Sequence, residues 1–329
     1  MTTSTLTRPA SAEAGLAPET RETRRQRRKR ERLEERDSII PVELYGLRRG
    51  TVTLLTTLAF LFAIFTLVPI AWIVINSTKN QASLFETFGF WFARPFSFFH
   101  NFSLLFQNVD GYGPYIQWFG NTVLYAVLGG GGATVLSTLA GYGFARFGFR
   151  GSKMLFYLAI AALLVPVTAL TVPLYLSYAK AHLINSIWGI VLPSMVSPIG
   201  VYLMRVYADI SVPRELIDAA RIDGAGEARI FFRVALPLMV PGVMTVLLIN
   251  IVSVWNGYFL PLLIFNQNAK YPLTVGLGLW SLRAQNSGNA QLFPMLVIGG
   301  LVTIIPLIAL FLLLQRYWRG GILLGSIAN

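Results

Sequence analysis

Long apolar segments dominate this sequence and limit the folds that it can adopt. Residues 51–75 are almost wholly apolar, and a helix of that length crosses a bilayer core of about 30 Å with some tilt. Hydrophobic residues make up 54% of the 329-residue chain, and charged residues only 13%. These values are typical of a protein that crosses a membrane several times, and they exclude an ordinary soluble domain.

Six such segments predict an all-α membrane protein with six transmembrane helices. We expect a transmembrane domain over residues 51–316, between a basic tail at 1–50 and a short C-terminal tail at 317–329. The tail at 1–50 holds twelve of the 27 Lys and Arg, mixed with eight acids, so we expect it to be disordered. Anionic lipid is a better partner for it than nucleic acid, because the tail lacks interleaved aromatic residues. The six spans are expected at about 51–75, 118–144, 154–176, 186–207, 242–265 and 292–314.

Two patterns inside these spans predict how the helices pack. Small residues recur every four positions in span two, which predicts a face where a neighbouring helix approaches closely. These are Gly129, Ala133, Ser137, Gly141 and Ala145. Spans three and four contain Pro166, Pro173, Pro193 and Pro198, which predict kinks. Kinked helices can line a cavity or simply bend, and the sequence leaves both open.

A charged segment separates spans four and five. Residues 213–241 carry eight charged side chains before Val234, and burying them in the membrane would cost roughly 20 kcal/mol at about 3 kcal/mol each. We therefore expect this segment in water. Pro213 suits the start of a helix, and Gly224 can supply the left-handed residue that ends it. A second short helix is expected at about 226–235, stopped by the prolines that follow, with the next span beginning after them.

The charged segment also carries a family motif. Its run DAARIDGAGEARIFFRVALPLMVP resembles the cytoplasmic EAA motif of ABC importer permeases, in particular the carbohydrate-uptake family with its maltose-type members. Residues 218–220 match the Glu-Ala-Ala start with Asp in place of Glu, residues 223–225 match Asp-Gly-Ala, and residues 236–237 match Leu-Pro. The runs GYGFARFGFRG and WNGYFLP are also similar to this family, although Gly257 replaces the acid or small polar residue that is often found there.

The resemblance implies a role for the loop between spans four and five. In the family this loop is a coupling helix that docks into a cleft on the ATPase subunit. The residues implied in docking are Glu215, Asp218, Ala219, Ala220, Asp223, Gly224 and Ala225. The resemblance also implies three kinds of protein partner: a second homologous permease, an ABC ATPase dimer and an extracytoplasmic sugar-binding protein. ATP and Mg would be used by the ATPase, and this chain lacks the GxxxxGK[ST] motif, so we expect a non-catalytic subunit without a cofactor.

Polar residues in span five are candidates for a solute path. Asn250, Ser253 and Asn256 are spaced three apart and are expected to share one helix stripe, close to Tyr258. A polar stripe in a membrane helix faces other helices or a watery path. These four residues therefore either contact a sugar or hold neighbouring helices together, and the sequence alone does not choose.

Charge predicts the orientation and narrows the alternatives. Placing both termini, the 145–153 turn and the 209–240 loop on one side collects 22 Lys and Arg there, with Arg205 at the end of span four included, against five on the other. The positive-inside rule then predicts cytoplasmic termini in a bacterial cytoplasmic membrane. An ion-coupled or facilitative carrier and a passive scaffold are the alternatives. The predicted spans contain no Asp or Glu, which argues against a proton-coupled carrier, and the chain has no cysteine for a thiolate metal site.

Overall fold

The computed structural model describes residues 49–107, 113–286 and 292–317, and this part of the chain forms helices, turns and loops without a strand. Within it, five helices are long and apolar enough to cross a membrane, and one bent pair would make a sixth. The protein is therefore an all-α, multi-pass membrane protein. The five are Gly50–Ser77, Tyr115–Arg146, Trp188–Ser211, Glu227–Trp255 and Leu292–Leu314. The expected tails at 1–50 and 317–329 lie almost wholly outside the described residues.

The chain falls into two compact units, residues 1–68 and residues 69–329. The first unit is described only over the beginning of α2 (Arg49–Ser77), where large apolar side chains such as Leu58, Phe62 and Phe65 are exposed. Exposed apolar groups around a helix suit a lipid environment, in agreement with the first predicted span. In the second unit, the short helices α3 (Gln81–Glu86) and α4 (Phe98–Leu104) follow α2.

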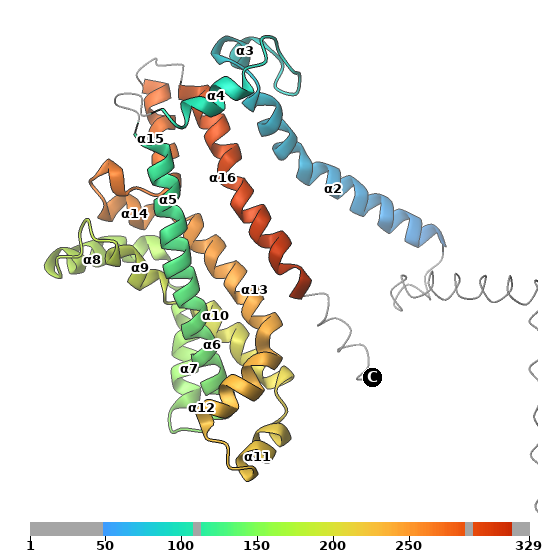
Figure 1. The fold of residues 1–329 in the computed structure, drawn as a ribbon, viewed down its shortest axis with the longest axis vertical. Helices are drawn as coiled ribbons and strands as arrows, with labels where there is room; N and C mark the ends of the chain where they lie inside the picture. The colour runs from blue at the N-terminus through green and yellow to red at the C-terminus, as the bar shows by residue number, and fades with distance from the viewer. Residues whose placement is uncertain (1–48, 108–112, 287–291, 318–329) are drawn as a thin grey trace, which may run out of the picture. The chain divides into compact units, whose positions relative to one another are not determined.

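The centre of the second unit is the contact between α6 (Gly131–Arg146) and α10 (Pro198–Ser211), with α13 (Leu236–Trp255) packed against both (Figure 1). The predicted small-residue face is confirmed, because all five of its members are buried. A Cβ added to Gly141 would lie 2.6 Å from Cβ of Met204 and 2.7 Å from the backbone nitrogen of Arg205. Only a residue without a side chain allows the two backbones to approach this closely.

One face of α5 (Tyr115–Tyr125) holds the loop that follows span five. Trp118 Nε1 donates to the carbonyl of Asn268 over 2.8 Å, and Thr122 Oγ1 accepts from the backbone N–H of Leu273 over 2.7 Å. Asn121 and Tyr125 donate to further carbonyls of the same loop. The side chains at these four positions share one face of α5 because they are spaced three and four residues apart. Below them, the π-helical turn η2 (Ala126–Gly130) continues α5 into α6.

The third span differs from its prediction. A single helix was expected at 154–176, but α7 (Ser152–Ala161) and the turn η3 (Ala162–Leu164) are separated from α8 (Val167–Lys180) by a bend of 107°. Pro166 causes the break, because the ring of a proline disfavours the helical conformation in the residue before it. Val165 accordingly has φ −80° and ψ 117°.

The fifth span also differs. We expected prolines to stop a short helix before a span at 242–265, but the helix runs through them from Glu227 to Trp255. It begins as α12 (Glu227–Ile230), widens into the π-helical turn η4 (Phe231–Ala235) and continues as α13. The wide turn directly precedes Pro237, which occupies the first turn of α13, where a missing N–H is best tolerated. The helix then ends at Trp255, and α14 (Phe259–Ile264) is a separate short helix.

Residues 266–290, which lie between the fifth and sixth predicted spans, contain a packed helix. After the turn η5 (Asn268–Lys270), α15 (Leu273–Asn286) lies against α16 (Leu292–Leu314) and α5. Leu273 and Trp280 are fully buried there. Trp280 stacks on Tyr115 with their ring centroids 5.8 Å apart. The apolar side of this segment was missed because its glycines and polar residues are typical of a loop.

Packing at Gly141 can be tested against a matched glycine in the same helix. We expect Gly141→Ala to destabilise the protein by about 1–3 kcal/mol, because its methyl group would overlap α10. Gly143→Ala is the control, since a Cβ there meets nothing within 4 Å. Thermal unfolding of the detergent-solubilised protein should give a lower midpoint for the first variant only. Equal midpoints would show that the α6–α10 contact is looser than described.

Candidate functional site

A helical hairpin follows α10 at one end of the bundle (Figure 1). Its first helix is α11 (Arg214–Ile222), with Pro213 directly before it. Gly224 has φ +78°, as predicted from the sequence, and its N–H donates to the carbonyl of Arg221. The N–H of Ala225 donates to the carbonyl of Ala220, so the left-handed glycine lets the chain satisfy the last carbonyls of α11 before α12 begins.

A single buried side chain anchors α11. Ile217 is 3% exposed and packs in a cluster formed by residues of α6, α10, η4 and α13, whereas Leu216 and Ile222 are exposed. Burying one isoleucine contributes about 1.5–3 kcal/mol. The helix is therefore attached to the body on one side, and none of the described residues covers its opposite side.

The residues that the motif predicted for docking are together on this hairpin, but they do not share one surface. Five are exposed: Glu215, Asp218, Ala219, Asp223 and Gly224. Ala220 and Ala225 are half-buried and pack against the cluster around Ile217. The two alanines of the motif therefore face in different directions, with Ala219 outward and Ala220 toward the protein's own core.

Charged side chains brace the hairpin on its outer side. Arg221 Nε lies 2.8 Å from Glu227 Oε1, and Arg221 Nη1 lies 3.3 Å from Asp218 Oδ1. The hydrogen bond to Glu227 is the largest cause of the raised pKa of Arg221. Because all three side chains are well exposed, these pairs contribute little stability and mainly fix the relative position of α11 and α12.

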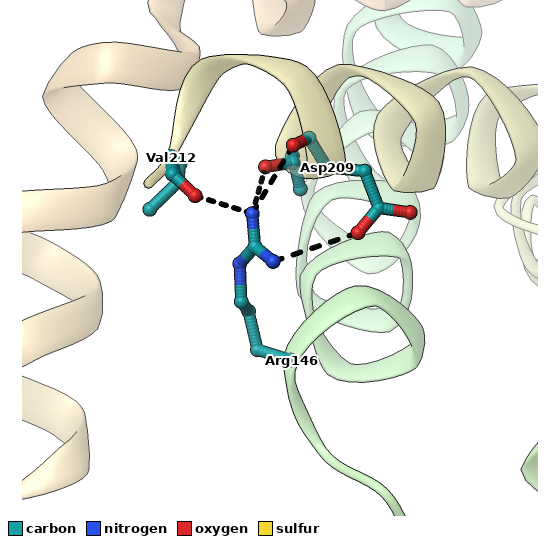
Figure 2. A network of polar contacts seen from close by, with 4 residues as sticks. Arg146, Asp209 and Val212 are labelled. Atoms are coloured by element: carbon teal, nitrogen blue, oxygen red, sulfur yellow. Dashed lines mark hydrogen bonds and ion pairs between the residues drawn. The ribbon is translucent and has the colours of Figure 1, made fainter. Parts of the chain in front are cut away.

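Arg146, the last residue of α6, binds the end of α10 (Figure 2). Its Nη2 donates to the carbonyls of Ala208 and Val212, and its Nη1 lies 3.5 Å from Oδ1 of Asp209. The last carbonyls of a helix have no partner within the helix and carry a partial negative charge, so a cation there is stabilising. Arg146 also borders a pocket of about 130 Å³ beside α11, together with Arg214, Ile217, Asp218 and Arg221.

A second group of polar residues lies at the centre of the bundle. Asn250 of α13 is 4% exposed, and its Nδ2 donates to Thr134 Oγ1 over 3.2 Å. Its Oδ1 accepts a hydrogen bond of 2.7 Å from Ser197, the residue that caps α10. Thr134 and Ser137 of α6 are also buried. These bonds join α6, α10 and α13, so Asn250 has the helix-contact role that the sequence left open.

A pocket of about 320 Å³ lies beside this network, and uncharged residues line it. Two breaks between helices meet there. The first lies between α9 (Trp188–Ser194) and α10, and the second lies between α13 and α14. Its lining includes Ser194, Ser197, Asn250, Ser253, Gly257 and Tyr258.

The expected stripe of span five is thus only partly formed. Ser253 is exposed and, with Asn250 and Tyr258, lines the pocket. Asn256 is outside the pocket lining. Asn256 directly follows Trp255, the last residue of α13, and its Nδ2 donates to the carbonyl of Val252.

Sequence reasoning missed the roles of Arg146, Thr134 and Ser197. Arg146 was noted only as part of a basic turn. A signal for it was available, since a lone arginine at the end of a small-residue face is placed to reach the helix that the face packs against. Ser197 directly precedes Pro198, which is a typical start for a helix, but the partner of its hydroxyl lies 53 residues away in the sequence.

Comparison with known proteins identifies the family. Residues 133–320 match the family of binding-protein-dependent transport system inner membrane components. The chain belongs to this family. The match covers α6 and every described element after it, including the hairpin and both pockets. The chain is thus a membrane-embedded permease subunit of a binding-protein-dependent transport system.

Individual relatives agree. The arabinooligosaccharides transport system permease protein AraQ of Bacillus subtilis is 34% identical over 70% of this chain and 78% of its own length. The diacetylchitobiose uptake system permease protein NgcG of Streptomyces coelicolor is 28% identical over 82% of this chain and 86% of its own. A crystal structure of a bacterial ABC transporter that imports the acidic polysaccharide alginate has a similar fold. Its matched chain gives a TM-score of 0.69 at 23% identity and covers 82% of this chain and 98% of that one.

Proposed function

We propose that this chain is one permease subunit of an ATP-driven ABC importer for a sugar or oligosaccharide, and that the hairpin at 213–235 is its docking point for the ATPase. Two observations together support the proposal. The chain matches the family, and the outer face of the hairpin is exposed, with its charged side chains held in place by ion pairs. Relatives whose names specify arabinooligosaccharides and diacetylchitobiose support a carbohydrate substrate.

The partners follow from this assignment. A binding-protein-dependent system needs an extracytoplasmic binding protein to deliver the solute, an ATPase dimer to use ATP and Mg, and a second permease to complete the path. Glu215, Asp218, Ala219, Asp223 and Gly224 form the exposed docking surface. Ala220 and Ala225 contribute by packing inward, which keeps α11 close to the bundle.

The pocket beside Asn250 is proposed as this chain's share of the solute path. Hydroxyl and amide groups with an aromatic ring nearby, as supplied by Ser253, Asn250 and Tyr258, suit the hydrogen bonding and stacking that a sugar offers. Discontinuous helices at mid-membrane are a common setting for solute sites in transporters. Asn256 is not part of this proposed path, because its side-chain amide donates a hydrogen bond to the carbonyl of Val252 in α13.

The orientation is proposed from charge. With the bent pair α7–α8 counted as one span, six spans place both termini and the hairpin on the cytoplasmic side of a bacterial membrane. The five basic residues on the opposite side are far fewer than the 22 on this one.

Docking through the hairpin predicts a specific phenotype at Gly224. We expect Gly224→Val to abolish ATPase copurification and ATP-dependent uptake, because a β-branched residue at φ +78° costs at least roughly 1–2 kcal/mol and would reshape the turn. Gly226→Val is the matched control, since Gly226 has φ −72° and ψ 158°, which valine adopts readily. Membrane insertion should be normal in both. Full uptake by the Gly224 variant would contradict the proposal that the hairpin docks the ATPase.

Orientation can be measured directly, because the chain contains no cysteine and a single introduced thiol can be labelled without background. We expect an impermeant maleimide added to intact spheroplasts to label Ser103→Cys and to leave Ala228→Cys unlabelled. Both positions are exposed, so lysis should allow both to react. Labelling of Ala228→Cys in intact cells would invert the topology.

The proposed path predicts that narrowing the pocket slows uptake. Ser253 is exposed and lines the pocket, so Ser253→Trp should fit without disturbing the fold while filling part of the space. We expect uptake to fall at least about tenfold, which corresponds to about 1.4 kcal/mol in the barrier. Asn256→Trp, outside the pocket, is the control. Sugar-panel uptake by the purified complex in proteoliposomes measures both, and equal rates would place the path elsewhere.

A further inference from the structure

The guanidinium group of Arg146 lies where three elements of the protein meet. The side chain leaves the end of α6, is 6% exposed, and reaches the last turn of α10 (Figure 2). The carbonyl of Val212 that it binds belongs to the residue directly before Pro213, where α11 begins. Val212 itself is fully buried. A single cation therefore holds the base of the coupling hairpin.

Beyond its base, α11 is attached through Ile217 and Ala220, which pack in the apolar cluster, and through the pairing of Arg221 with Glu227 of α12. Its one buried side chain is Ile217, and a pocket of about 130 Å³ lies between Arg146 and the first turns of α11. A force on α11 can therefore reach the transmembrane helices by two routes, through the short link at residues 212–213 and through α12, which continues into α13. Pro213 restricts that link further, because its ring fixes φ near −59°.

Helix α6 connects Arg146 to the polar network at the centre of the bundle. Thr134 lies twelve residues earlier in the same helix, which at 1.5 Å per residue is about 18 Å away. Thr134 accepts the hydrogen bond from Asn250, which lines the central pocket. Close packing of α6 on α10 at Gly141 lies between these two points. The hairpin base and the central pocket are thus joined by one helix that is held at both ends.

We propose that Arg146 is the positioning residue that makes α6, the end of α10 and the start of α11 move as one rigid body when the ATPase displaces the hairpin. This inference rests on the proposed docking function and names the contact that transmits it. Arginine suits this role because its planar group can donate to two carbonyls and pair with Asp209 in one fixed geometry. A lysine ammonium could bind one or two of these oxygens but would hold the helix end less firmly.

A role in stability alone would make different predictions. If Arg146 only capped α10, its loss would lower the folded fraction, and the surviving molecules would keep the wild-type relation between α6 and α11. If Arg146 transmits movement, folded complexes of the variant would retain the ATPase but lose the fixed distance between these helices. The distance between α6 and α11 is therefore the informative readout.

The absence of cysteine allows this distance to be measured with two spin labels. One label replaces Leu139 on the exposed side of α6, and the other replaces Leu216 on the exposed side of α11. Double electron–electron resonance on the full complex in nanodiscs, with and without ATP, Mg and vanadate, gives the distance distribution. For the wild type and for Arg150→Met we expect one narrow distribution that is the same in both nucleotide states. Arg150 is exposed and serves as the matched control.

For Arg146→Met we expect the ATPase to copurify while the distribution broadens and shifts on nucleotide addition. Arg146→Lys should give an intermediate width, and it replaces the methionine variant if that variant fails to fold. A distribution identical to wild type in the folded Arg146 variants would overturn the proposal. Failure of the wild-type chain to retain the ATPase would instead refute the proposed docking function, and the width measured in the permease alone would still test Arg146.

Discussion

The close contact between α6 and α10 is the constraint on which the rest of this structure depends. Because no side chain stands at Gly141, the two backbones meet at a distance that a methyl group would prevent. This approach brings the short hydroxyl and amide groups of Thr134, Ser197 and Asn250 within hydrogen-bonding distance at the centre of the bundle. It also places the last residue of α6 beside the last turn of α10, where Arg146 can reach the carbonyls of Ala208 and Val212. Helix packing in a membrane, where lipid supplies no hydrophobic drive between helices, makes such small residues especially important.

The sequence predicted those features that follow from local chemistry. The first and last spans, at 51–75 and 292–314, have the expected positions because an apolar run of membrane length permits few other structures. The turn at Gly224 was predictable because a helix end needs a left-handed residue there. The burial of the small-residue face followed from its four-residue period. The docking residues stay a prediction, since the structure contains no partner.

Features that depend on context were missed, and prolines provide the clearest case. Pro166 breaks its span by 107°, whereas Pro237 lies inside a continuous helix. The difference comes from the backbone around each ring: a π-helical turn widens the helix directly before Pro237, while Val165 adopts an extended conformation before Pro166. Similarly, the three-residue spacing of Asn250, Ser253 and Asn256 suggested one stripe, but the helix ends before its third member. The position of a helix end depends on the loop that follows the helix. Here Thr274 Oγ1 donates to the carbonyl of Gly257 and helps to hold the loop after α13.

The chemistry at the base of the hairpin also explains why a costly charge is placed there. Burying a guanidinium is expensive when its one paired carboxylate, that of Asp209, is partly exposed, and Nε of Arg146 has no acceptor among the described residues. An apolar residue at this position would avoid that cost, but the carbonyl of Val212 would lose the donor that Arg146 supplies, and the carbonyl of Ala208 would keep only the N–H of Val212. Those carbonyls lie at the end of α10 and directly before Pro213, and the helix that follows has one buried side chain, Ile217. A hairpin can transmit force if its base is held in one geometry. Hydrogen bonds from a planar cation are directional and fix such a geometry, whereas apolar contacts are not directional.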